Sequence, residues 1–148
     1  QHLASGYVRY CDDFVLFSND KAQLNRSLLL IQTWLSTMRL RLSRYKLFPS
    51  TQGLDFLGYR HFAAGYILLR KRTARRIARR IKSLWAHVGK LRNLQNAMGK
   101  LASAKGWIKH ANSHNFRVRL SFDWLYDMVM LLNKKERAYE RLSQQLEH

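Results

Sequence analysis

The sequence is poor in the residues that stabilise small domains by means other than a hydrophobic core. Its 148 residues contain one cysteine, Cys11, and one proline, Pro49. A single cysteine excludes an intrachain disulfide and any zinc site built from several cysteines. It fits a reducing compartment, and we expect the protein to be cytoplasmic.

Long apolar stretches are also missing. No apolar run approaches the roughly 20 residues that a membrane-spanning helix needs, and no signal-peptide pattern opens the sequence. With 47% hydrophobic and 12% aromatic residues, the composition is nevertheless that of a globular chain. The length allows one good core or two small ones.

Acidic residues are scarce and unevenly placed. Nine acidic residues face 27 lysines and arginines, which gives a net charge of +18, and none lies between Asp55 and Asp123. Such a field predicts a polyanionic partner, of which nucleic acid is the first candidate. A membrane surface attracts the same kind of segment, so charge alone does not name the partner.

The pattern of residues 1–69 predicts a mixed α and β region. Apolar runs at Tyr7–Tyr10 and Phe14–Ser18 flank two aspartates and predict a β-hairpin. Apolar residues at helical spacing predict a helix from about Lys21 to Met38, with the N-cap among residues 18–20. Further strands are expected at Tyr45–Phe48, Leu54–Phe62 and Tyr66–Leu69, the last two forming a hairpin around Gly65.

From Arg70 onward the pattern predicts a basic, all-α bundle in residues 70–145. The first helix has Thr73 as its expected N-cap and ends near Gly89, and the second spans about Asn93 to Ala111. The third runs from residues 113–116 towards Arg141, with a break near Asn133. We expect the boundary between the two domains near Leu69. Residues 146–148 resemble an expression-tag remnant and are excluded from fold reasoning.

Asp12 and Asp13 form the first candidate site. Adjacent carboxylates repel one another unless a cation offsets them. Mg²⁺ prefers carboxylate oxygens, and phosphoryl chemistry often requires it. The alternative is an ordinary Asp-rich turn, because aspartate is common in turns.

A basic run forms the second candidate site. Eight cations occur in the thirteen residues from Arg70 to Lys82, without one acid. Such a face repels itself unless it meets a polyanion, although the common alternative is a solvated charged face. Contacts with phosphates would supply affinity and salt dependence but no sequence choice. The candidate nucleic-acid-binding residues are Arg70, Lys71, Arg72, Arg75, Arg76, Arg79, Arg80, Lys82, Lys105 and Lys109.

Two further groups have structural interpretations. His110 and His114 have a spacing that can bind metal on a helix, but with no third ligand nearby we expect surface histidines. Trp85, Trp107 and Trp124 fall on apolar faces and are expected in the core rather than as base-stacking platforms.

Three motifs in order resemble the C-terminal part of a reverse transcriptase palm. Tyr10-Cys11-Asp12-Asp13 matches the family's Tyr-x-Asp-Asp hairpin. Leu40–Lys46 matches Leu-x-Leu-Ser-x-x-Lys, and Phe56-Leu57-Gly58-Tyr59 matches Phe-Leu-Gly-Tyr/Phe. Each motif is weak alone, but the three in sequence, followed by a basic helical segment, form a strong signal. The resemblance covers about residues 7–112.

Among reverse transcriptases, the bacterial types look closest. Arg9–Phe14 is similar to both group II intron proteins and diversity-generating retroelement enzymes, whereas Gly53–Arg60 and Leu68–Thr73 look more like the retroelement group. Gly106–Asn112 resembles the thumb helix of both. The resemblance implies an α+β fold, in which a partial palm (β-hairpin, helix, second β-hairpin) precedes a three-helix thumb bundle.

The resemblance also implies roles for individual residues. Asp12 would be the principal ligand and Asp13 an auxiliary ligand of two Mg²⁺ ions. Lys46 would approach the triphosphate, or would equally be a solvated lysine at a strand edge; Leu47 follows it where the family usually has threonine. The primer grip would consist of Phe56, Leu57, Gly58 and Tyr59, which are also compatible with a plain core strand.

The implied partners are an RNA template, a DNA or RNA primer and dNTPs, with a basic accessory protein for the retroelement type and no membrane. The family needs another metal-binding Asp and finger elements upstream, and none fits in residues 1–6. We therefore expect a fragment that is inactive alone and whose unpaired hairpin edges favour self-association. The alternative function is a non-catalytic, basic nucleic-acid-binding module.

Overall fold

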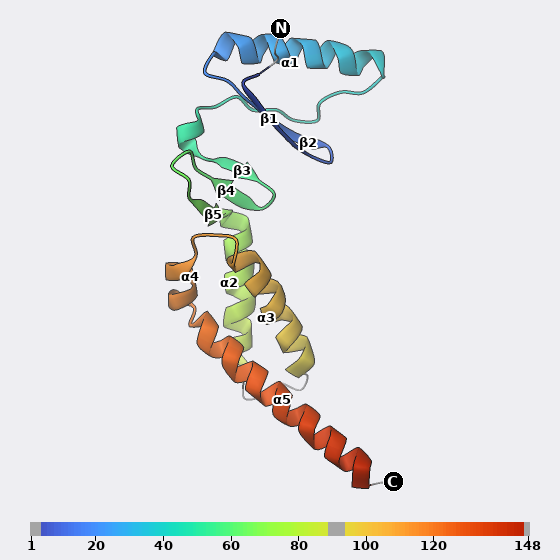
Figure 1. Ribbon diagram of the computed structural model, residues 1–148, viewed down its shortest axis with the longest axis vertical. Helices are drawn as coiled ribbons and strands as arrows, with labels where there is room; N and C mark the ends of the chain where they lie inside the picture. Colours follow the sequence, from blue (N-terminus) through green and yellow to red (C-terminus); the bar gives the residue numbers. More distant parts are fainter. Residues whose placement is uncertain (1–3, 89–93, 147–148) are drawn as a thin grey trace. The chain divides into compact units, whose positions relative to one another are not determined.

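The computed structural model describes residues 4–88 and 94–146 and has an α+β fold. Within these ranges it contains five α-helices and two small antiparallel sheets (Figure 1). Packing divides the chain into two compact units, of which the first ends at Leu47 and the second begins at Phe48. The sequence instead places a boundary near Leu69. In the second unit the strands before Leu69 are bonded to the helices that follow.

The first unit begins with the expected hairpin. Strand β1 (Gly6–Tyr10) pairs antiparallel with β2 (Asp13–Phe17), and Tyr10 lies opposite Asp13. Helix α1 (Lys21–Thr37) follows, and the Asp20 side chain accepts a hydrogen bond of 2.7 Å from the Ala22 amide. The predicted hairpin, helix and N-cap region are confirmed.

The first unit has almost no buried core. Among its described residues only Ser27, on α1, is fully buried. The apolar face of α1 that includes Leu24 and Leu28 is half-buried, whereas Trp34 is 62% exposed. The hairpin forms a sheet of two strands, so within the described residues both of its outer edges lack a neighbouring strand.

Residues 38–49 have no regular structure, and the strand predicted at Tyr45–Phe48 was wrong. A strand is stabilised by pairing with a neighbour, and in the part of the chain that the structure describes no strand pairs with this segment. A 3₁₀ turn, η1 (Ser50–Gln52), ends at Gly53, which has a φ of 76°.

The second unit opens with a three-stranded antiparallel sheet in the order β3-β4-β5. Its strands are β3 (Leu54–Phe56), β4 (Tyr59–His61) and β5 (Ile67–Leu69). The single strand predicted over residues 54–62 was wrong, because Leu57 and Gly58 form a turn with φ values of 49° and 85°. Two successive positive φ values are typical of a type I′ hairpin turn. The turn around Gly65 occurs as predicted.

Three long helices and one short helix follow the sheet. They are α2 (Lys71–Ala86), α3 (Leu94–Ile108), α4 (His114–Arg119) and α5 (Phe122–Leu146). The N-cap of α2 is Arg70, so Thr73 is buried inside the first turn and its prediction as N-cap was wrong. Helix α2 ends before Gly89, which lies outside the described residues, as does Asn93.

The third predicted helix is two helices. Ser121 has a φ of 45°, a value that a continuous right-handed helix does not allow, and it separates α4 from α5. The break expected near Asn133 was wrong, because α5 is continuous there. Residues 146–148 were interpreted as an expression-tag remnant. Leu146 is the last residue of α5, and residues 147–148 lie outside the described range.

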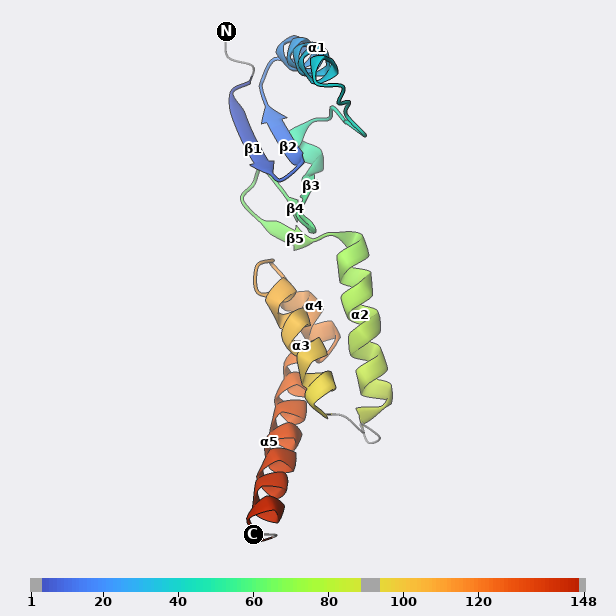
Figure 2. The ribbon, with the colours of Figure 1, turned by 90° about the vertical axis from the view of Figure 1, so that its right-hand side faces the viewer.

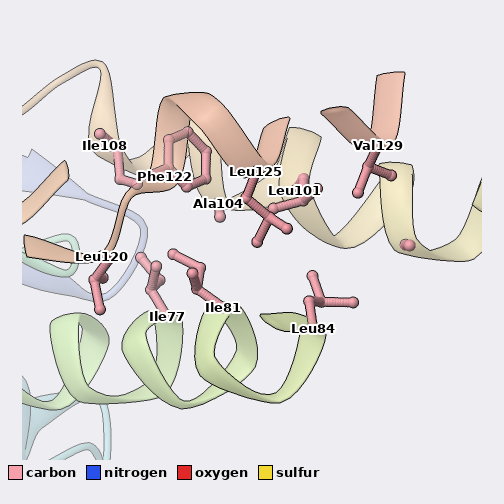
Figure 3. Packing of buried hydrophobic residues seen from close by; sticks show 11 residues of the cluster. Ile77, Ile81, Leu84, Leu101, Ala104, Ile108, Leu120, Phe122, Leu125 and Val129 are labelled. Atoms are coloured by element: carbon pink, nitrogen blue, oxygen red, sulfur yellow. The ribbon is translucent and has the colours of Figure 1, made fainter. Parts of the chain in front are cut away.

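The core of the second unit lies between α2, α3 and α5 (Figure 2). Side chains of α2 point towards those of α3 and α5 (Figure 3). The core residues are Ile77, Ile81, Leu84, Ala97, Leu101, Ala104, Ile108, Leu120, Phe122, Leu125 and Val129. No helix among the described residues is long and apolar enough to cross a membrane.

Candidate carboxylate pair and nucleic-acid interface

The two aspartates lie at the tip of the β1–β2 hairpin. The turn is made by Cys11 and Asp12, and Asp13 is the first residue of β2. Cys11 has a φ of 54°, which is unusual for a residue other than glycine. The Arg9 Nε donates a hydrogen bond of 2.7 Å to the Cys11 carbonyl. The local backbone therefore presents two adjacent carboxylates at an exposed tip.

Both carboxylates are free to bind a cation. No ion pair joins Asp12 or Asp13 to a basic residue in the described chain. Mg²⁺ is often held by one or two carboxylates together with water and substrate phosphates, and this pair fits that pattern. Within the described ranges no group of three or more His, Cys, Asp or Glu side chains could hold a metal.

Lys46 lies in the irregular segment after α1 and is exposed. The described residues contain no ion pair between Lys46 and either carboxylate. The alternative of a solvated lysine at a strand edge is correct in its exposure, but no strand contains it. Its role at a triphosphate stays a prediction.

The predicted primer-grip residues form the β3–β4 hairpin. Phe56 and Tyr59 are the paired residues that close it, and Leu57 and Gly58 form the turn. Leu57 is 45% exposed at the tip. The turn backbone is held from the helical side, because the Arg70 amide donates a hydrogen bond of 3.0 Å to the Gly58 carbonyl.

The sheet is also bonded to α3 and to the loop that follows it. The Asn112 amide donates to the Ile67 carbonyl at 2.7 Å, and the Ile67 amide donates to Asn112 Oδ1 at 2.8 Å. The Tyr59 hydroxyl donates to the Trp107 carbonyl at 3.0 Å. These bonds explain why packing groups the sheet with the helices.

Helix α2 has one buried face and one basic face. Thr73, Ile77, Ile81 and Leu84 are buried, whereas every lysine and arginine of the helix is exposed. We call the exposed cations the basic face. They are Lys71, Arg72, Arg75, Arg76, Arg79, Arg80 and Lys82.

Most of the basic face has no internal counter-charge. Arg76 lies over the Trp107 ring, 5.9 Å from its centroid, and Arg70, just before the helix, pairs with Asp55 at 3.3 Å. The other six cations have no carboxylate partner among the described residues. Because they are close together and exposed, they form a surface that suits a polyanion.

The two predicted lysines of α3 have different surroundings. The Lys105 ammonium lies 4.1 Å from the centroid of the Tyr126 ring, so a cation–π contact already holds it. Lys109 is exposed beside a shallow depression of about 460 Å³. His114 and Arg117 also line this depression. His110 and His114 are exposed, as expected for surface histidines.

Two side chains of the second unit, Tyr59 and Arg117, have shifted pKa values. Burial raises the pKa of Tyr59 above its usual 10.0. A side-chain hydrogen bond to Asp123 and the charge of that carboxylate raise the pKa of Arg117, and the two groups are 2.7 Å apart. Arg117 was not among the predicted site residues; its only signal in the sequence was an aspartate six positions later.

The tryptophans are less buried than predicted. Trp124 is 60% exposed, so its assignment to the core was wrong, and Trp85 and Trp107 are half-buried. The Trp85 and Trp124 rings are stacked with centroids 5.0 Å apart. Trp85 also donates a hydrogen bond of 3.0 Å from Nε1 to the Leu120 carbonyl. Of the two stacked rings, Trp85 is therefore the inner one and Trp124 lies on the solvent side.

No model of a known protein family matches the chain, and no curated protein is significantly similar to it.

Proposed function

We propose that the chain is the C-terminal palm portion and thumb of a bacterial RNA-directed DNA polymerase. The observation that carries the proposal is the pair Asp12 and Asp13, which are exposed at the two-residue turn of a β-hairpin and form no ion pair with any described residue. Two adjacent carboxylates repel one another, and a metal-dependent nucleotidyl transfer would use them as ligands of the cation that offsets this repulsion.

In this proposal Asp12 and Asp13 would supply carboxylate ligands to Mg²⁺. When bound, the metal would activate the primer hydroxyl and offset the charge of the leaving pyrophosphate. Cys11 and the Arg9 hydrogen bond would hold the two carboxylates in place. Lys46 would act on the triphosphate from the irregular segment that follows α1.

The second unit would hold the template–primer duplex. The basic face of α2 offers cations to the phosphates, and the β3–β4 turn offers an exposed apolar tip at Leu57. Phosphate contacts of this kind fix register and affinity without reading sequence. This is the behaviour that a polymerase thumb needs, because it must follow any template.

Primer extension tests the catalytic part of the proposal. A polypeptide that carries residues 1–148 together with upstream palm strands should incorporate dNTPs on an RNA template in the presence of Mg²⁺. Asp12→Asn should lower incorporation by at least about 1,000-fold, and Asp13→Asn by less, because removing a metal ligand removes stabilisation of the transition state. Incorporation that survives both substitutions would refute the catalytic role. Residues 1–148 alone should not extend a primer.

A non-catalytic nucleic-acid-binding module is the second candidate. The seven cations of the basic face, none of which has a carboxylate partner among the described residues, favour it independently of the aspartates. Changing Arg72, Arg75, Arg79 and Lys82 to Gln should lower the salt-dependence slope of duplex binding by about 3 to 4. The matched control changes Lys134, Lys135, Arg137 and Arg141 of α5 to Gln, which removes the same charge elsewhere. Equal effects of the two sets would contradict a specific role of α2.

A further inference from the structure

We propose that Trp107 is a positioning residue that fixes the Leu57–Gly58 turn to the helical bundle, so that the turn and the basic face of α2 bind one duplex as a single surface. The inference rests on the proposed binding of nucleic acid by the second unit. It adds that packing on Trp107 fixes the position of the Leu57–Gly58 turn relative to the basic face of α2.

The first observation is steric. A Cβ atom added at Gly58 would lie 2.5 Å from Trp107 Cζ3 and 2.8 Å from Cη2. Real Cβ atoms do not approach other atoms so closely, so the indole lies directly on the turn backbone. Gly58 also has a φ of 85°, which glycine adopts without strain. The turn and Trp107 therefore fit together only with glycine at this position.

The second observation is that the next residue along the turn holds the same tryptophan. The Tyr59 hydroxyl donates to the Trp107 carbonyl at 3.0 Å, and the two rings are 5.4 Å apart between centroids. A hydrogen bond and a ring contact together restrict both the position and the tilt of the turn relative to α3.

The third observation connects Trp107 to the basic face. The Arg76 guanidinium lies 5.9 Å from the centroid of the Trp107 ring, and the Arg70 amide binds the Gly58 carbonyl at the start of α2. One indole thus contacts the turn and a cation of α2. A displacement of the turn would disturb all of these contacts together.

The fourth observation is that the turn has an exposed surface to offer. Leu57 is 45% exposed and borders a shallow depression of about 260 Å³, which Tyr59, Ser103, Gly106 and Trp107 also line. An apolar tip of this kind suits the sugar and base edges of a duplex, while the basic face suits its phosphates.

A double-mutant cycle tests the proposal on an RNA–DNA hybrid. Leu57→Ala should weaken binding about fivefold in the wild-type background, because an apolar contact is lost. In a Trp107→Ala background the same change should have almost no effect, because the turn is no longer held against the duplex. A full fivefold loss in both backgrounds would overturn the proposal. Trp124→Ala, on the exposed ring of α5, is the matched control and should leave the effect of Leu57→Ala unchanged.

Two further readouts separate positioning from general structural damage. Trp107→Ala should leave the salt-dependence slope unchanged, because the cations of α2 remain, and Trp107→Phe should restore part of the coupling. If Trp107→Ala prevents folding, Tyr59→Phe removes only the hydrogen bond to the Trp107 carbonyl and should reduce the coupling in the same direction. No reduction would overturn the proposal. If the wild-type chain does not bind the hybrid at all, the proposed function fails; if it binds without coupling, only this inference fails.

Discussion

The two compact units differ in how they are stabilised. Among the described residues, the second unit buries eleven apolar side chains, which belong to α2, α3, α5 and Leu120, whereas the only fully buried residue of the first unit is Ser27. Hydrophobic burial is the dominant favourable term in folding. The second unit therefore has a hydrophobic core that can support independent folding. The first unit is stabilised by local hydrogen bonds and by a helix whose apolar face is only half-buried.

The largest expected effect tests this difference directly. Phe122→Ala should lower the free energy of unfolding of the second unit by about 3–5 kcal/mol, because a fully buried ring leaves a cavity. Leu28→Ala in the half-buried face of α1 should cost about 1 kcal/mol or less. Hydrogen exchange measured separately on α1 and α5 gives both values. Equal costs would show that the first unit has a core comparable to that of the second.

The next effect tests whether the β3–β5 sheet belongs to the helical bundle. Gly58→Ala should cost about 2–5 kcal/mol, because a positive φ and a collision with Trp107 act together. Gly65→Ala is the matched control, since Gly65 has nearly the same φ but nothing within 4 Å of the added Cβ. It should cost only about 1–2 kcal/mol. Thermal denaturation of the two variants measures the difference, and similar costs would mean that the Trp107 contact contributes little.

A smaller effect concerns the local stabilisation of the first unit. Asp20→Ala should destabilise α1 by about 1 kcal/mol, because it removes the acceptor for the Ala22 amide. Asp20→Asn retains a capping side chain but loses the exposed ion pair with Arg26, and should change stability by a few tenths of a kcal/mol. Amide hydrogen exchange, which reports the helicity of α1, distinguishes the Asp20→Ala variant from the Asp20→Asn variant. A loss of helicity as large for Asn as for Ala would assign the effect to the ion pair.

The smallest effect is a pH dependence in the second unit. Burial raises the folded-state pKa of Tyr59 above 10.0, so its contribution to stability is complete below that pH and is lost as the pH rises through the folded-state pKa. Tyr59→Phe should remove this component. Denaturation of the wild type and the variant at about pH 9 and about pH 12 measures it. A pH dependence identical in both would show that the hydroxyl bonded to Trp107 is not the group responsible.

Sequence patterns predicted the elements whose signals are local. The hairpin around Asp12 was predicted from two apolar runs, and α1 and α2 from apolar residues at helical spacing. These signals depend on neighbours within a few residues, so tertiary packing does not overrule them.

The errors occurred where distant contacts decide the structure. Gly58 is the only local sign of a turn beside Leu57, and leucine itself rarely adopts a positive φ. The turn is held here by the contacts of Gly58 with Trp107 and Arg70, which are distant in the sequence or in another element. The strand expected at Tyr45 lacks a partner strand, which no local pattern can reveal. Trp124 was placed in the core because it falls on an apolar face, whereas in the structure it is 60% exposed and stacks on the Trp85 ring.

For the candidate site, the sequence identified the aspartate pair and the cations of α2, and the structure added their surroundings. The position of the acids at the hairpin tip and of the cations on the outer side of α2 was predicted, but which described residues form ion pairs was not, because Arg70 and Arg117 find Asp55 and Asp123 only in the folded chain. The contact of Gly58 with Trp107 was also hidden, since the two residues are far apart in the sequence.

The break at Ser121 has a consequence for how α5 joins the bundle. Leu120 and Phe122 are both buried, yet residues two apart on one continuous helix point in nearly opposite directions. The positive φ of Ser121 shifts the rotational phase of the chain, so that both side chains enter the same core. A continuous helix here would have to expose one of them. The backbone conformation of Ser121 thus allows Leu120 and Phe122 to be buried in the same core.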